Sequence, residues 1–214
     1  MNTLPRPRPA PVVIEGRYAR LEPLSLAHAQ GLYKASAEPE RFEFLPDAPP
    51  ASVADVRAWI ERYLTNDEYV FSAVVDRATG EAAGRQALMR IVPEHGVIEI
   101  GNILWGPAIS RTRVSTEAFY LAARHAFDEL GYRRFEWKCN DRNEPSKAAA
   151  LRFGFTFEGL FRQHMVVKGK SRDSAWFSII DREWPVIRAG FERWLDPSNF
   201  DSAGRQNAKL VARA

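Results

Sequence analysis

Residues 98–118 bring three kinds of chemistry-bearing group close together. Glu99 is a single carboxylate in an otherwise apolar strand, Arg111 and Arg113 follow in a short loop, and a helix begins near Ser115. The start of a helix offers unpaired backbone N–H groups and the positive end of its dipole, and both suit a phosphate. The segment therefore predicts a phosphate-binding loop. A capped amphipathic helix with two solvated arginines explains the local pattern equally well.

The elements that must position these residues are read from hydrophobic periodicity and from capping residues. Strands are expected over 18–24, 70–75, 83–92, 97–105, 133–139, 155–167 and 175–180, and helices over 26–37, after Ser52, over about 115–130 and over 146–153. Ser25 and Ser52 stand where N-caps are needed, and Gly131 and Gly154 stand where helices end.

This order predicts a mixed α/β (α+β) fold around one sheet. We expect about seven strands, mostly antiparallel, with flanking helices. Because a helix connects the strands 97–105 and 133–139, these two should run parallel, and we expect them to splay apart at their C-terminal ends. The predicted domain covers residues 14–195, between a flexible proline-rich arm over 1–13 and a loose tail over 196–214.

Four pieces of the sequence, in this order and spacing, resemble the GNAT N-acetyltransferases, and among them the group related to the ribosomal-protein N-terminal (alanine/serine) acetyltransferases. The resemblance spans about residues 14–184. The pieces are Ile98-Glu-Ile-Gly101 followed by Pro107; Ser115-Thr-Glu-Ala118, opening the helix that ends in Leu130-Gly-Tyr132; Asn143-Glu-Pro-Ser146, with Phe153-Gly-Phe155 and Glu158-Gly159 beyond it; and the closing strands around residues 168–172.

The resemblance implies transfer of an acetyl group from acetyl-CoA to a primary amine by direct attack, with no metal. It implies that the pantetheine arm enters the gap between the parallel strands and that the pyrophosphate meets the loop and helix start. Asn143 is expected to bind the coenzyme arm, to cap the following helix, or both. The implied coenzyme-binding residues are Ile103, Leu104, Arg111, Thr112, Arg113, Val114, Ser115, Thr116, Asn143 and Ser146.

Two features depart from the family pattern. The usual pyrophosphate loop, Gln/Arg-x-x-Gly-x-Gly/Ala, falls on residues 110–115, and all three of its signature positions differ. Backbone donors survive such changes in a helical conformation, and arginine can add charge-assisted bonds. The tyrosine that protonates the departing thiolate is replaced by Ala150. Ser146 is the candidate for that role, although a contact with the backbone explains it equally well. Cys139 is interpreted as a buried structural thiol rather than a nucleophile.

Glu99 is the candidate general base. An amine must lose a proton before it attacks a thioester, and a carboxylate facing the cleft can accept that proton, usually through water. Burial in an apolar strand would raise the pKa of Glu99 toward a useful value. Strand alternation leaves open whether Glu99 faces the cleft, points outward or forms a structural ion pair.

Composition narrows the class of protein. The chain has 214 residues, 45% of them hydrophobic and 27% charged, which is typical of one soluble domain. A transmembrane helix and a secretory signal are not expected, and with one cysteine the simplest location is the cytoplasm. The histidine spacing does not suggest a metal site. The net charge of +3 is too small to indicate a nucleic-acid binder by itself.

Two other functions stay open. The altered loop and the missing tyrosine would suit a catalytically inactive acyl-CoA-binding or interaction protein. The basic turn near Lys168 and Arg172 would suit a nucleic-acid binder, but the small net charge of the chain argues against that class of protein. For an active enzyme, the acceptor could be a protein N-terminus, an amino acid, a polyamine-like amine or an antibiotic amine. A homodimer is also left open.

Overall fold

The computed structural model describes residues 4–213. One open sheet of eight strands forms its centre, in the order β1-β2-β3-β4-β5-β6-β8-β7. Neighbouring strands are antiparallel except β5 and β6, which confirms the predicted mixed sheet and its parallel pair. The strands are β1 (Ile14–Glu15), β2 (Ala19–Pro23), β3 (Tyr69–Asp76), β4 (Ala82–Val92), β5 (Val97–Trp105), β6 (Arg134–Asn140), β7 (Thr156–Val167) and β8 (Lys170–Ile180).

The strand beyond the expected seven is the two-residue β1, which pairs at the sheet edge with β2. The helices are α1 (Ala29–Ala35), α2 (Val53–Leu64), α3 (Arg113–Arg124), α4 (Glu144–Arg152) and α5 (Trp184–Leu195), with short helical turns η1 (Leu26–His28), η2 (Pro39–Phe42), η3 (His125–Glu129) and η4 (Pro197–Asn199). Ser52 caps α2 as predicted, because its side chain accepts a hydrogen bond from the Asp55 N–H at 3.2 Å.

Helix α5 is absent from the predicted elements. Its buried residues Trp184, Ile187, Phe191 and Trp194 recur every three or four positions, which is a helical pattern that could have revealed it. Phe191 packs on Phe119 of α3, with ring centroids 5.5 Å apart. The helix therefore completes the aromatic core on that face of the sheet.

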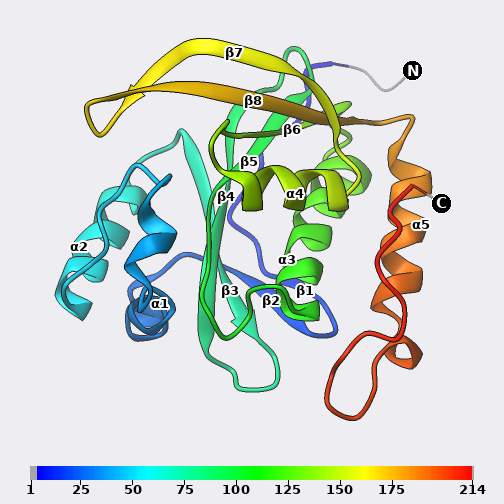
Figure 1. Ribbon diagram of the computed structural model, residues 1–214, viewed down its shortest axis with the longest axis horizontal. Helices are drawn as coiled ribbons and strands as arrows, with labels where there is room; N and C mark the ends of the chain where they lie inside the picture. Colours follow the sequence, from blue (N-terminus) through cyan, green and yellow to red (C-terminus); the bar gives the residue numbers. More distant parts are fainter. Residues whose placement is uncertain (1–3, 214) are drawn as a thin grey trace.

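Helices cover the two faces of the sheet separately (Figure 1). On one face, Ile98 and Ile100 of β5 pack with Phe119 under α3 and α5. On the other face, Phe71 and Ala87 pack with the residues of α1 and α2. Since alternate residues of a strand face opposite sides, Glu99 lies on the α1/α2 face.

The parallel pair separates soon after it forms. β5 and β6 are paired at three positions only, Val97 with Arg134, Ile98 with Phe135 and Glu99 with Glu136. Further along, the register between β4 and β5 shifts opposite Asn102, which adopts a left-handed φ of 50°. A bulge of this kind bends a strand, so β5 turns away from β6 and leaves a gap between them.

Residues 4–13 and 196–213, the described parts of the expected arm and tail, make contacts with the rest of the chain. In the arm, the Arg6 N–H donates to the Pro93 carbonyl at 3.0 Å, and the Tyr132 hydroxyl donates to the Pro7 carbonyl at 3.1 Å. In the tail, Leu210 and Ala212 are buried. Long-range packing of this kind leaves little trace in local composition.

Candidate active site

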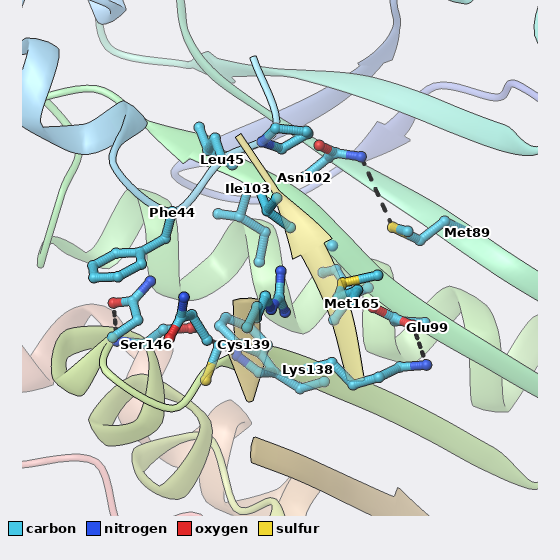
Figure 2. A pocket seen from close by; sticks show the side chains of 18 of the residues that line it. Phe44, Leu45, Met89, Glu99, Asn102, Ile103, Lys138, Cys139, Ser146 and Met165 are labelled. Atoms are coloured by element: carbon cyan, nitrogen blue, oxygen red, sulfur yellow. Dashed lines mark hydrogen bonds and ion pairs between the residues drawn. The ribbon is translucent and has the colours of Figure 1, made fainter. Parts of the chain in front are cut away.

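A pocket of about 280 Å³ opens where β5 and β6 separate (Figure 2). Its walls come from these two strands, from β3 and β4, from η2 and the segment after it, from the β7–β8 hairpin and from the start of α4. Four of the residues that the sequence proposed for catalysis or coenzyme binding line it: Glu99, Ile103, Asn143 and Ser146. The side chain of Leu104 instead lines a second pocket, beside α1 and α2.

Glu99 combines two of the interpretations left open by the sequence, because it both lines the pocket and forms a buried ion pair. Its side chain is 6% exposed, and Oε2 lies 2.7 Å from Lys138 Nζ and 3.2 Å from Arg90 Nε. Lys138 Nζ also lies 3.4 Å from Glu136 Oε2 and 3.7 Å from the centre of the Trp176 ring. Burial raises the pKa of the Glu99 carboxyl above its ordinary value, while Lys138 and Arg90 oppose that rise.

Ser146 lies at the opposite end of the pocket from Glu99 (Figure 2). Asn143 caps α4, because its Oδ1 accepts from the Ser146 N–H at 3.1 Å, so the helix starts two residues before the predicted Ser146. The indole N–H of Trp137 donates to Ser146 Oγ at 3.0 Å. A hydroxyl oxygen that accepts one bond still has its own hydrogen to donate. Ser146 can therefore act as a donor in the pocket, where the neighbouring Cys139 thiol also interacts with this hydroxyl.

Cys139 also lines the pocket but is buried at the end of β6. Burial raises the pKa of its thiol, against a smaller opposite effect of a hydrogen bond with Ser146. A thiol with a raised pKa is a poor nucleophile at neutral pH. This agrees with its interpretation as a structural cysteine.

The N-terminus of α3 begins at Arg113, slightly before the predicted position. Thr112 is the N-cap, and its hydroxyl accepts from the Val114 N–H at 3.1 Å. Just before it, the exposed Arg111 has a left-handed φ of 61°. A left-handed residue beside a helix start turns successive backbone N–H groups toward one side, which forms a concave site for anions.

The side chains of the residues after Arg111 do not contribute to this anion site. The Arg113 guanidinium stacks on Tyr18 and Phe200, 4.4 Å and 5.2 Å from the ring centres. The hydroxyls of Ser115 and Thr116 donate to the Thr112 carbonyl at 3.2 Å and 3.0 Å. Within this loop and first turn, therefore, the groups available to a phosphate are backbone amides and the side chain of Arg111.

Comparison with known proteins decides the family. Residues 19–156 match the family described as acetyltransferase (GNAT) domain. The chain belongs to the GNAT acetyltransferase family. The structure of a GCN5-related N-acetyltransferase from Brucella melitensis is 52% identical in sequence, with a TM-score of 0.95 over 98% of this chain and 96% of that one. The structure named as a probable acetyltransferase (GNAT family) from Chromobacterium violaceum is 36% identical, with a TM-score of 0.80 over 86% of this chain and 93% of that one.

A more distant GNAT structure shares the fold. The microcin C7 self-immunity acetyltransferase MccE, solved in complex with acetyl-CoA and AMP, is 22% identical, with a TM-score of 0.67 over 77% of this chain and 93% of that one. The narrower resemblance to the ribosomal-protein group stays a prediction. Within residues 4–213 of this GNAT chain, no helix has both the length and the apolar character that a membrane crossing requires.

Four cationic residues of this GNAT pocket were not assigned to it from the sequence: Arg41, Arg90, Lys138 and Arg172. Lys138 stands two positions after Glu136, so the two side chains lie on the same face of β6, and Glu136 is the residue that pairs with Glu99. Strand alternation could therefore have placed Lys138 beside Glu99. Arg41 offered no local signal. Its Nη1 donates to the Trp105 carbonyl and to Ser110 Oγ, both at 3.1 Å, and these contacts join η2 to the loop before α3.

Proposed function

We propose that this GNAT protein is an N-acetyltransferase that moves an acetyl group from acetyl-CoA to a primary amine. The observation that carries the proposal is the pocket between the separating strands, with the Glu99 carboxylate at one end and the Ser146 hydroxyl at the other. Proteins of this family use acetyl-CoA, and the related MccE structure contains it.

The chain offers a coherent path for the coenzyme. The backbone amides at the start of α3 and the Arg111 side chain would bind the pyrophosphate. The pantetheine arm would run into the gap beside Ile103, whose neighbouring backbone is left unpaired by β6, and Asn143 would border it. These residues fit the coenzyme, whose pantetheine arm carries amides and whose pyrophosphate is anionic. The gap exposes strand backbone for the amides, and the N-terminus of α3 offers N–H groups for the pyrophosphate.

The proposed reaction follows from the two ends of the pocket. The amine nitrogen attacks the thioester carbonyl carbon, and its proton passes to Glu99, directly or through water. The C–N bond forms as the C–S bond breaks. Ser146 donates its hydroxyl hydrogen to the departing thiolate and recovers one from water. Trp137 acts as a positioning residue, because its N–H occupies an Oγ lone pair and directs the hydroxyl hydrogen away from the indole.

Acetyl-CoA is expected to stabilise the folded protein. A ligand that binds only the folded state adds about 2.7 kcal/mol at about 100 times its dissociation constant. For a chain of this size that corresponds to a rise in Tm of about 5–10 °C. Thermal unfolding and titration calorimetry measure the effect. Unchanged Tm up to millimolar coenzyme, together with silent calorimetry, would contradict the proposal, whereas binding without thiol release over a panel of amines would indicate an inactive acyl-CoA-binding protein.

Arg111 and Arg113 are expected to differ in their effect on coenzyme affinity, although the sequence suggested the same role for both. Arg111→Gln should raise the Kd for acetyl-CoA about 3- to 10-fold, because a charge-assisted contact with phosphate is lost, and added salt should narrow the difference. Arg113→Gln should change that Kd less than about twofold. It should instead lower the unfolding free energy by about 0.5–1 kcal/mol, since its guanidinium packs on two rings. Calorimetry and denaturant unfolding separate the two effects, and the reverse ranking of affinities would contradict this assignment.

A further inference from the structure

A third pocket, which is basic, adjoins the one that holds Glu99. It has a volume of about 150 Å³ and shares four lining residues with its neighbour: Phe44, Asn140, Val167 and Arg172. Its walls come from the end of β6, the segment after η2 and the turn between β7 and β8. The Lys168 ammonium donates to the Phe42 carbonyl at 2.7 Å, and this bond joins the hairpin turn to η2.

Four cations line this basic pocket, and we call them the basic rim: Arg142, Lys168, Lys170 and Arg172. Glu43 is the one carboxylate among the lining residues that the structure describes. Within residues 4–213, no carboxylate oxygen lies within 4.0 Å of any rim cation. None of the four rim cations is therefore held in a close ion pair, and in the lining Glu43 stands against four positive charges.

The neighbouring pocket has the same sign of charge. Four cations line it, Arg41, Arg90, Lys138 and Arg172, and Glu99 is the carboxylate among its described lining residues. Carboxylates outside the lining offset part of this charge, because Glu38 pairs with Arg41 and Glu136 lies 3.4 Å from Lys138. Arg172 has no such partner within 4.0 Å among the described residues. The pKa of His164, another lining residue, is affected by these positive charges. Burial lowers the pKa of its imidazole first, and the positive charges of Arg90, Lys138 and Arg172 lower it further. A potential of this sign attracts anions and opposes the entry of polycations.

We propose that the basic rim binds an anionic group of the acceptor, and that the preferred acceptors are amines carrying a carboxylate or phosphate a few bonds from the reacting nitrogen. This inference rests on the proposed acetyl transfer. It selects among the acceptors that the sequence left open, because it disfavours polyamines and polycationic antibiotics. The amine would lie at Glu99, and its anionic group would reach the shared wall at Arg172.

The phosphates of the coenzyme are the other anions that the rim could bind. Two observations favour the acceptor. The rim adjoins the pocket on the α1/α2 face, where Glu99 and Lys138 lie, whereas α3 covers the opposite face. Arg111 and the start of α3 already offer donors for a phosphate. None of residues 111–116 lines the basic pocket.

The test measures binding of matched amines to the coenzyme A-loaded protein, which cannot react. One series contains butylamine, putrescine and 4-aminobutyrate, which differ only in the terminal group. The other contains the tripeptides Ala-Gln-Gln, Ala-Lys-Lys and Ala-Glu-Glu, each amidated at its C-terminus so that only the side chains differ in charge. We expect the anionic member of at least one series to bind about tenfold more tightly than the neutral and cationic members, with an advantage that falls as salt is added. Initial rates with acetyl-CoA should follow the same order.

A variant that lacks two exposed rim charges tests whether the rim causes the preference for anionic amines. Arg142→Gln/Lys170→Gln should reduce the advantage of the anionic amine about tenfold and leave the Kd for acetyl-CoA within about twofold. Arg57→Gln/Lys209→Gln, which removes two exposed charges outside both pockets, is the matched control and should leave the preference intact.

The outcomes distinguish the possible failures. No preference for the anionic amines, or no binding of them to protein that has bound coenzyme A, overturns the inference. So does a rim variant that weakens acetyl-CoA as strongly as it weakens the anionic amine, because the rim would then serve the coenzyme. Failure of the unmodified protein to bind acetyl-CoA would instead overturn the proposed function.

Discussion

Replacing Glu99 with Gln is expected to lower the turnover number about 100- to 10,000-fold, which is the range that a general base contributes. Glutamine keeps the size and hydrogen bonding of the side chain but cannot accept a proton from the amine. The Kd for acetyl-CoA should stay within about twofold of wild type, because Glu99 lies beyond the coenzyme path. Steady-state kinetics and calorimetry measure the two quantities.

The pH dependence gives an independent check on Glu99. A base works only when deprotonated, so the wild-type rate should fall as the pH drops through the pKa of Glu99, which burial holds above its ordinary value. Glu99→Gln should lose this acidic limb. Glu136→Gln is the matched control, because Glu136 pairs with Glu99 across β5 and β6 but does not line the pocket. Near-normal turnover in folded Glu99→Gln, with the acidic limb unchanged, would make Glu99 purely structural.

Replacing Lys138 with Met is expected to lower the unfolding free energy at neutral pH by about 3–5 kcal/mol, as when one partner of a buried ion pair is removed. The side chains of Lys138 and Glu99 are 5% and 6% exposed, so the substitution leaves a carboxylate with little access to water. Arg90 remains in contact with it but is itself nearly half exposed. Urea unfolding of the variant and the wild type measures the difference.

The pH dependence of this loss has a definite sign. Without Lys138, the folded-state pKa of Glu99 should rise still further above its unfolded value, so the folded state binds more protons than the unfolded state. Stability relative to wild type should then fall as the pH rises through this range and recover as the pH drops toward the ordinary carboxyl pKa. Glu99→Gln/Lys138→Met removes the stranded charge and should regain most of the loss. A pH-independent loss that the double variant shares would point to packing against Trp176 instead.

Local patterns in the sequence determined most of the sheet. Strands show an alternation of side chains that is independent of their partners, so β5 was placed at its observed bounds. Helix ends depend on adjacent residues. Ser52 caps α2. Gly131, after η3, and Gly154, after α4, adopt left-handed φ angles of 70° and 90°, where most other residues would be strained. A strand–helix–strand unit also has a strong preference for parallel pairing, which predicted the gap that holds the site.

Only the tertiary structure decided which side chains meet. Lys138 reaches Glu99 because three register pairs align β5 and β6, and Arg41 approaches from a turn more than fifty residues earlier in the chain. Arg113 was expected at the phosphate, yet it stacks on Tyr18 and Phe200, which come from opposite ends of the sequence. Such contacts depend on long-range register and packing, to which local periodicity and composition are insensitive. The charge around the pocket, on which the choice of acceptor is argued, therefore became visible only in the folded chain.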